Sequence, residues 1–141
     1  MLNFTGTTAI IAIVGAILIL IVLFGSSFVV RRSRRNSKLA NFRPRWQDVQ
    51  KLCSKSDTWP VAIINADKLV DEALKLTGFK GKTMGERLVA AQRTLSDNDG
   101  AWYGHKLRNK IVHEDVPKLQ KADVQGALKG LRQALMDLGV L

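Results

Sequence analysis

The sequence predicts an all-α protein, in which a single N-terminal transmembrane helix precedes a small cytoplasmic bundle of four to five helices. Three observations predict this architecture. Residues 9–30 form an apolar run without any charged side chain, and residues 31–45 are strongly basic. Through residues 46–141, apolar side chains recur at the three- and four-residue spacing of amphipathic helices. Residues 1–8 are then a short extracytoplasmic N-terminus.

The apolar run is long enough to cross a membrane as one helix. From residue 9 to residue 30 it would span about 33 Å, at about 1.5 Å per residue, against a hydrocarbon core about 30 Å thick. A cleavable signal peptide would carry its basic residues before the apolar stretch, but residues 1–8 have none. A buried core helix is also disfavoured, because the rest of the chain is too short to cover an all-apolar helix on every side.

The basic segment predicts the orientation. The chain has a formal net charge of +10, and residues 31–45 contain seven Lys and Arg side chains and no acid. Lys and Arg stay on the cytoplasmic side, so we expect a single-pass protein of the cell membrane with its N-terminus outside. Residues 31–45 would form a juxtamembrane linker, whose contacts with the bilayer and its anionic headgroups come from Arg31, Arg32, Arg34 and Arg35. An RNA-binding arm is the alternative use of these charges.

Residues 46–141 contain local signals for the ends of helices. A short amphipathic segment is expected from Trp46. The next helix begins after Asp57 or Thr58 as the capping residue and stops at Gly78. Pro44 argues against a helix through the preceding linker.

The second half of the domain continues this pattern. Thr83 and Glu86 have the spacing of a capping box at the start of a third helix. Residues 96–100 predict a turn, a fourth helix follows over residues 101–114, and a last helix ends at Gly139. The domain is therefore predicted to be a compact helical bundle.

Polar side chains gather on the fourth predicted helix, which contains both histidines of the chain. Trp102, His105, Asn109 and His113 are spaced by three, four and four residues, so they share one stripe of the helix. Arg108 lies about 100° around from Asn109. Apolar packing does not require such a set, which makes this helix the candidate functional site.

The segment LRNKIVHE, in which Arg108 and Asn109 precede His113, resembles the signature of the HEPN superfamily. That signature is an arginine and a histidine with four to six residues between them, and with a polar residue after the arginine. The resemblance covers residues 46–141 and implies a bundle of four or five helices. Many HEPN domains are metal-independent ribonucleases, in which two protomers bring their Arg and His residues to a shared cleft. Other members bind nucleotides or act as interaction modules.

Carried over to this chain, the resemblance implies a catalytic set of Arg108, Asn109 and His113. Arg108 would hold a phosphate and stabilise its developing negative charge. His113 would exchange protons with the attacking 2′-hydroxyl or with the leaving oxygen. Asn109 would orient the histidine or the phosphate, while His105 and Trp102 would contribute to binding.

Two classes of function remain open at this point. The first is a membrane-anchored HEPN-like module that binds RNA or nucleotide, works as a homodimer and cleaves RNA without a cofactor. The second is a non-catalytic, membrane-tethered interaction or scaffold domain, in which Trp102 and Tyr103 would form the partner surface. Burial of His113 would favour this second class. In a purely structural role, Asn109 and His113 would cap or bridge neighbouring helices and Arg108 would pair with Asp97 or Asp99. A zinc site is not expected, because the two histidines have no acidic partner on their stripe.

Overall fold

The computed structural model describes residue 6 and residues 11–24, 38–114 and 118–141. The chain divides into two compact units, Met1–Lys38 and Leu39–Leu141. Where the structure describes secondary structure, it is helical and contains no strand. The predicted all-α class is therefore confirmed for the described part of the chain.

In the first unit, residues 11–24 form a helix whose large apolar side chains are exposed. The remaining residues of the predicted span, 9–10 and 25–30, lie outside the described residues. So do residues 1–8 other than Gly6, and the predicted headgroup contacts Arg31, Arg32, Arg34 and Arg35. None of the helices described by the structure combines the length and the apolar character needed to cross a membrane.

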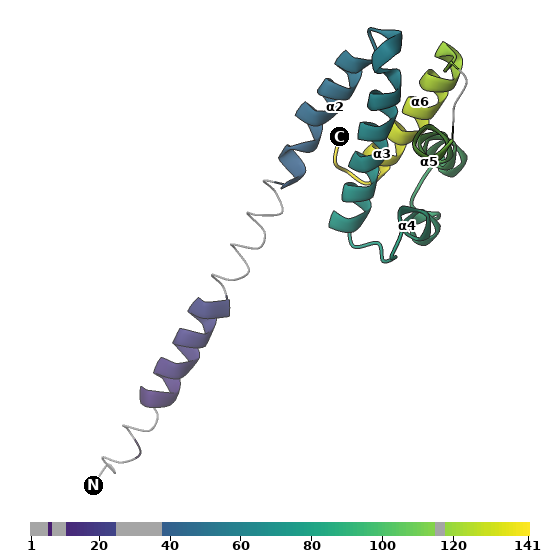
Figure 1. Cartoon of the computed structure of the whole chain (residues 1–141). Helices are drawn as coiled ribbons and strands as arrows, with labels where there is room; N and C mark the ends of the chain where they lie inside the picture. The colour runs from purple at the N-terminus through teal and green to yellow at the C-terminus, as the bar shows by residue number, and fades with distance from the viewer. Residues whose placement is uncertain (1–5, 7–10, 25–37, 115–117) are drawn as a thin grey trace. The chain divides into compact units, whose positions relative to one another are not determined.

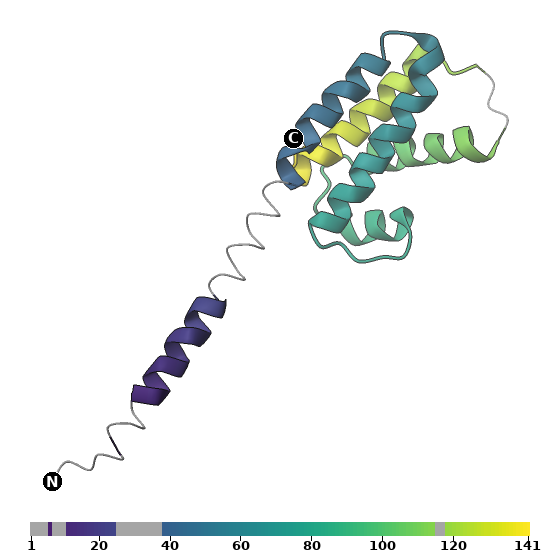
Figure 2. The ribbon, with the colours of Figure 1, turned by 60° about the vertical axis from the view of Figure 1, so that its left-hand side comes forward.

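The second unit is a bundle of five α-helices and one short 3-10 helix (Figure 1). In chain order these are α2 (Phe42–Leu52), η1 (Ser56–Thr58), α3 (Trp59–Leu76), α4 (Met84–Ala91), α5 (Asn98–His113) and α6 (Lys121–Asp137). In Figure 2, α2, α3 and α6 run along a common direction and α5 crosses them steeply. Helix α3 is central, because it contacts α2, α4, α5 and α6.

The apolar stripe of α3 forms the middle of the core. Each of the apolar residues predicted for this stripe is at most 1% exposed. They are Ala62, Ile63, Ala66, Leu69, Val70, Ala73 and Leu74. Leucines of α4 and α6 pack against them, among them Leu88, Leu131 and Leu135. Burial on this scale supplies the main driving force for folding, at about 25 cal/mol per Å² of apolar surface.

The domain begins earlier than the sequence predicts. Residues 42–45 were assigned to the linker, but α2 starts at Phe42, and that ring is 4% exposed in the core. Pro44 does not prevent this, because it lies in the first turn, where a backbone N–H has no helical acceptor. Arg45 then pairs with Glu72 of α3, with a 3.0 Å bond from Nη2 to Oε1. The segment after Leu39 is therefore part of the folded domain.

The structure confirms three of the predicted helix boundaries, at Gly78, Thr83 and Gly139. Gly78 and Gly139 have positive φ angles of 95° and 69°, which glycine adopts without strain. The Thr83 side chain accepts a bond from the Glu86 N–H and caps α4. The predicted turn over 96–100 is confirmed only at residues 96–97, because α5 begins at Asn98 after Asp97, whose carboxylate accepts from the Gly100 N–H at 2.9 Å.

Candidate functional site

Glycines allow α5 and α6 to pack closely where the two helices cross. A Cβ atom on Gly130 of α6 would lie 2.2 Å from the backbone carbon of Gly100. A Cβ atom on Gly104 would lie 2.5 Å from Cγ of Leu131. The two helices can therefore approach at backbone distance. This close packing buries Gly104 against α6.

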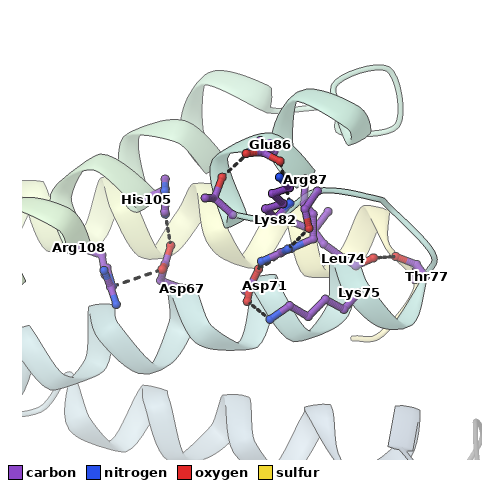
Figure 3. Close-up of polar contacts among 12 residues, drawn as sticks. Asp67, Asp71, Leu74, Lys75, Thr77, Lys82, Glu86, Arg87, His105 and Arg108 are labelled. Carbon is purple, nitrogen blue, oxygen red and sulfur yellow. Dashed lines mark hydrogen bonds and ion pairs between the residues drawn. The ribbon is translucent and has the colours of Figure 1, made fainter.

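The polar side of α5 meets a carboxylate from α3. His105 Nδ1 lies 2.9 Å from Oδ1 of Asp67, and Nε2 of the same ring lies 3.3 Å from Nδ2 of Asn109. Arg108 donates from Nη1 to Oδ1 of Asn109 at 3.0 Å, and its Nε lies 3.6 Å from Oδ2 of Asp67. Figure 3 shows His105 and Arg108 converging on Asp67 from α5. Four side chains thus form one connected network, here called the Asp67 network.

Asp67 is the most buried member of this network. Its side chain is 7% exposed, against 13% for His105 and 31% for Arg108. A carboxylate this deeply buried is costly unless charged or hydrogen-bonding groups surround it. His105 and Arg108 supply these groups, so Asp67 holds both α5 side chains in place.

The Asp67 network borders an open groove between α3, α4 and α5. The groove has a volume of about 430 Å³, and Asp67, His105, Arg108 and Asn109 all line it. Lys68, Asp71 and Thr83 complete its polar part. Among the described residues, no protein atom accepts from Nη2 of Arg108. That amino group therefore remains available to a ligand.

A second buried ion pair joins α3 to α4 one turn beyond Asp67. Asp71 accepts from Nε of Arg87 at 2.8 Å and also from Nη2, while Nη1 donates to the Gly81 carbonyl at 2.6 Å. Lys75 donates to the other oxygen of Asp71 at 2.6 Å, as Figure 3 shows. Burial raises the pKa of Asp71, but the bonds from Lys75 and Arg87 outweigh it and hold the pKa below its ordinary value.

The four residues of the predicted α5 stripe do not all belong to the Asp67 network: His105 and Asn109 do, whereas Trp102 and His113 do not. Trp102 is half-buried, packs against the core and meets His105 edge-on at 5.9 Å between ring centroids. Its indole also faces Gly85 of α4, where a Cβ atom would lie 3.4 Å away. This packing gives Trp102 a structural role beside the groove.

His113 lies apart from the Asp67 network. It is exposed in the last turn of α5, and it forms no hydrogen bond or ion pair within the described residues. Burial of His113 would have favoured the interaction-domain hypothesis, but His113 is exposed. The purely structural interpretation paired Arg108 with Asp97 or Asp99, but Arg108 faces Asp67 and Asp97 caps α5.

Sequence reasoning missed Asp67, the residue that organises the site. A signal was present, because Asp67 is a carboxylate beside the apolar positions Ile63, Ala66 and Val70 of one helix. A buried acid in such a stripe requires a partner. The sequence does not indicate that the partner is His105, which is 38 positions further along the chain.

No family model, curated protein or solved structure matches the chain. Within the described residues, no group of three or more His, Cys, Asp and Glu side chains could hold a metal ion. The assignment of function therefore rests on the geometry around α5.

Proposed function

We propose that residues 39–141 form a HEPN-like module that binds RNA at α5, with Arg108 and His113 cleaving the strand without a metal ion. The observation that carries this proposal is the state of Arg108. Its guanidinium contacts both Asp67 and Asn109, Arg108 lines the groove, and Nη2 has no protein acceptor among the described residues. A prearranged donor of this kind suits a phosphate oxygen.

The exposed imidazole of His113 supports the second half of the proposal. His113 would accept the proton of a 2′-hydroxyl while that oxygen attacks the adjacent phosphorus. The bond from phosphorus to the 5′-oxygen then breaks, and a second imidazole donates the proton that the leaving oxygen needs. The products are a 2′,3′-cyclic phosphate and a 5′-hydroxyl, and no redox step or cofactor is involved.

A homodimer would supply the second imidazole. His113 is five positions after Arg108, which turns their side chains about 140° apart around α5. One copy therefore presents Arg108 and His113 in different directions. Two copies that meet along α5 would bring both His113 side chains to one site, with an Arg108 beside them.

The membrane anchor belongs to the same proposal. Residues 9–30 would cross the cell membrane, with residues 1–8 outside and the helical domain in the cytoplasm. The uncharged run and the basic cluster after it support this topology. Arg31, Arg32, Arg34 and Arg35 would contact anionic headgroups at the inner surface.

The test uses the full chain purified in detergent and a labelled single-stranded RNA in the presence of EDTA. Cleavage to cyclic-phosphate ends is expected, and His113→Ala should abolish it. Arg132→Ala is the matched control, since Arg132 is exposed on α6 and bonds only Met136 among the described residues. If His113→Ala cleaves as fast as the unaltered chain, the ribonuclease proposal fails.

A non-catalytic interaction domain is the second candidate. It is favoured by the mutual bonding of Asp67, His105 and Asn109, which a purely structural network would also show. Exposed apolar side chains, among them Val61, Val89 and Val112, offer a surface for a protein partner. Recovery of a stoichiometric protein partner from solubilised membranes, with no RNA cleavage, would favour this candidate.

A further inference from the structure

A second groove lies on the other side of α5, where α5 ends and α6 begins. It has a volume of about 530 Å³. Lys106, Lys110 and Lys118 line it together with an apolar part made by Tyr103, Leu107 and Leu119. We call it the lysine groove. Its α5 residues lie about half a turn around the helix from His105 and Arg108, so it is separate from the Asp67 network.

Tyr103 gives this groove a rigid aromatic surface. The phenol donates to Oδ1 of Asp123 at 2.9 Å. The ring also lies against Gly126, where a Cβ atom would approach to 3.4 Å of Cε1. Burial and the Asp123 carboxylate both raise the pKa of Tyr103, which keeps the phenol a donor. The residue is nevertheless 42% exposed, so a fixed ring faces solvent.

The charge of the lysine groove is positive. Three lysines face two acids, Glu114 and Asp123, and Asp123 already accepts the Tyr103 hydroxyl. Lys110 and Lys118 form no ion pair within the described residues. Lys106 lies over the Trp102 ring at 6.0 Å, which leaves its ammonium group able to bind an anion.

The lysines also lead toward His113. Lys106, Lys110 and His113 are spaced by four and three residues, which places them on one exposed stripe of α5. A chain of phosphates that follows these lysines would therefore pass His113. A base can lie against Tyr103 only when it is unpaired, because duplex bases are stacked inside their helix.

From these observations the geometry points to a subsite for single-stranded RNA in the lysine groove, where one base stacks on Tyr103 and the phosphates contact Lys106, Lys110 and Lys118. This inference rests on the proposed function and adds to it the selection of unpaired strands. Arg108 and His113 would act on the phosphodiester, while the lysine groove would hold the neighbouring nucleotide.

The experiment measures fluorescence anisotropy of the full chain in detergent with a fluorescein-labelled single-stranded oligoribonucleotide and with the duplex of the same sequence. Tyr103→Ala should weaken binding of the single strand about tenfold and leave duplex binding unchanged. Tyr103→Phe keeps the ring and should retain most of the affinity. Replacing Lys106, Lys110 and Lys118 by Gln should lower the slope of log K against log salt by about 0.7 per lysine. Lys129→Gln, exposed on α6 outside the groove, is the matched control and should change neither quantity.

The outcomes separate this inference from the proposed function. If Tyr103→Ala and the lysine variants bind as the unaltered chain does, while cleavage still requires His113, the lysine groove is not the subsite and the ribonuclease proposal stands. If the groove variants lose binding but no chain cleaves RNA, the subsite stands and the cleavage proposal fails. Binding of anionic lipid vesicles through the same lysines, with no affinity for RNA, would overturn the inference.

Discussion

Two acids of α3, Asp67 and Asp71, lie one helical turn apart, and each faces an arginine from another helix. Arg87 uses all three guanidinium nitrogens on Asp71 and the Gly81 carbonyl, and its side chain is 7% exposed. Arg108 is held more loosely, at 3.6 Å from Asp67 and 31% exposed, with Nη2 unused among the described residues. The difference indicates that Arg87 stabilises the fold and that Arg108 is available to a ligand.

Replacement of Arg87, whose three guanidinium nitrogens all have acceptors, should have the largest effect on stability. Arg87→Ala leaves the Asp71 carboxylate without its main partner and the Gly81 carbonyl without its donor, so we expect a loss of about 3–5 kcal/mol in the free energy of unfolding. Urea unfolding of the full chain, followed by tryptophan fluorescence, measures this quantity. A smaller loss for Arg87→Ala than for Arg108→Ala would contradict the comparison.

Replacement of Arg108 should affect RNA cleavage more than it affects the stability of the fold. Arg108→Ala is expected to slow cleavage by about 10²- to 10³-fold, the typical effect of losing one donor to a developing oxyanion. Its free energy of unfolding should fall by about 1 kcal/mol, since Asp67 keeps His105. Arg108→Lys retains the charge but not the forked geometry, and should recover little of the rate. Equal rates for all three chains would remove Arg108 from the mechanism.

Low pH should weaken the ion pair between Asp71 and Arg87. The pKa of Asp71 lies below its ordinary value of 3.8, because the bonds from Lys75 and Arg87 outweigh the effect of burial. The bond from Arg45 likewise holds the pKa of Glu72 below 4.5. Stability from a carboxylate with a lowered pKa is complete above the ordinary value and is lost as pH falls through the lowered one. Unfolding free energy should therefore decline below about pH 5, and Asp71→Asn should make that decline shallower.

The exposed partner of Asp71 should contribute least. Lys75 bonds Asp71 at 2.6 Å, but its side chain is 56% exposed. Pairs of this kind between adjacent helical turns are worth about 0.3–0.5 kcal/mol. Lys75→Gln should lower the free energy of unfolding by that amount, and added salt should narrow the difference. A loss comparable to that of Arg87→Ala would show that the two partners share the carboxylate equally.

The parts of the fold that follow from neighbouring residues were predictable. The apolar spacing of α3, the cap at Thr83 and the stop at Gly78 each depend on side chains within one or two turns, and the structure confirms them. The start of α2 was missed because Pro44 disfavours a helix interior but is tolerated in a first turn. The start of α5 was missed because residues typical of a turn also make good caps, as Asp97 does.

The candidate site was predictable only in part. Arg108, Asn109 and His105 were found because they share one helix, and the structure brings them together. Asp67 was not found, because its position opposite His105 depends on how α3 and α5 pack. Helical spacing also grouped His113 with the others, although the last residues of α5, Val112 and His113, are exposed.

The contact between Gly100 and Gly130 has a consequence for how the domain would meet a ligand. The backbones approach directly at Gly100 and Gly130, and Leu131 packs against Gly104 beside them, so a shift of α5 would break these contacts with α6. The groups that α5 presents are therefore set when the chain folds, and a ligand need not assemble them at the moment of binding. These side chains then lose their conformational entropy during folding, so the binding of a ligand costs little further side-chain entropy.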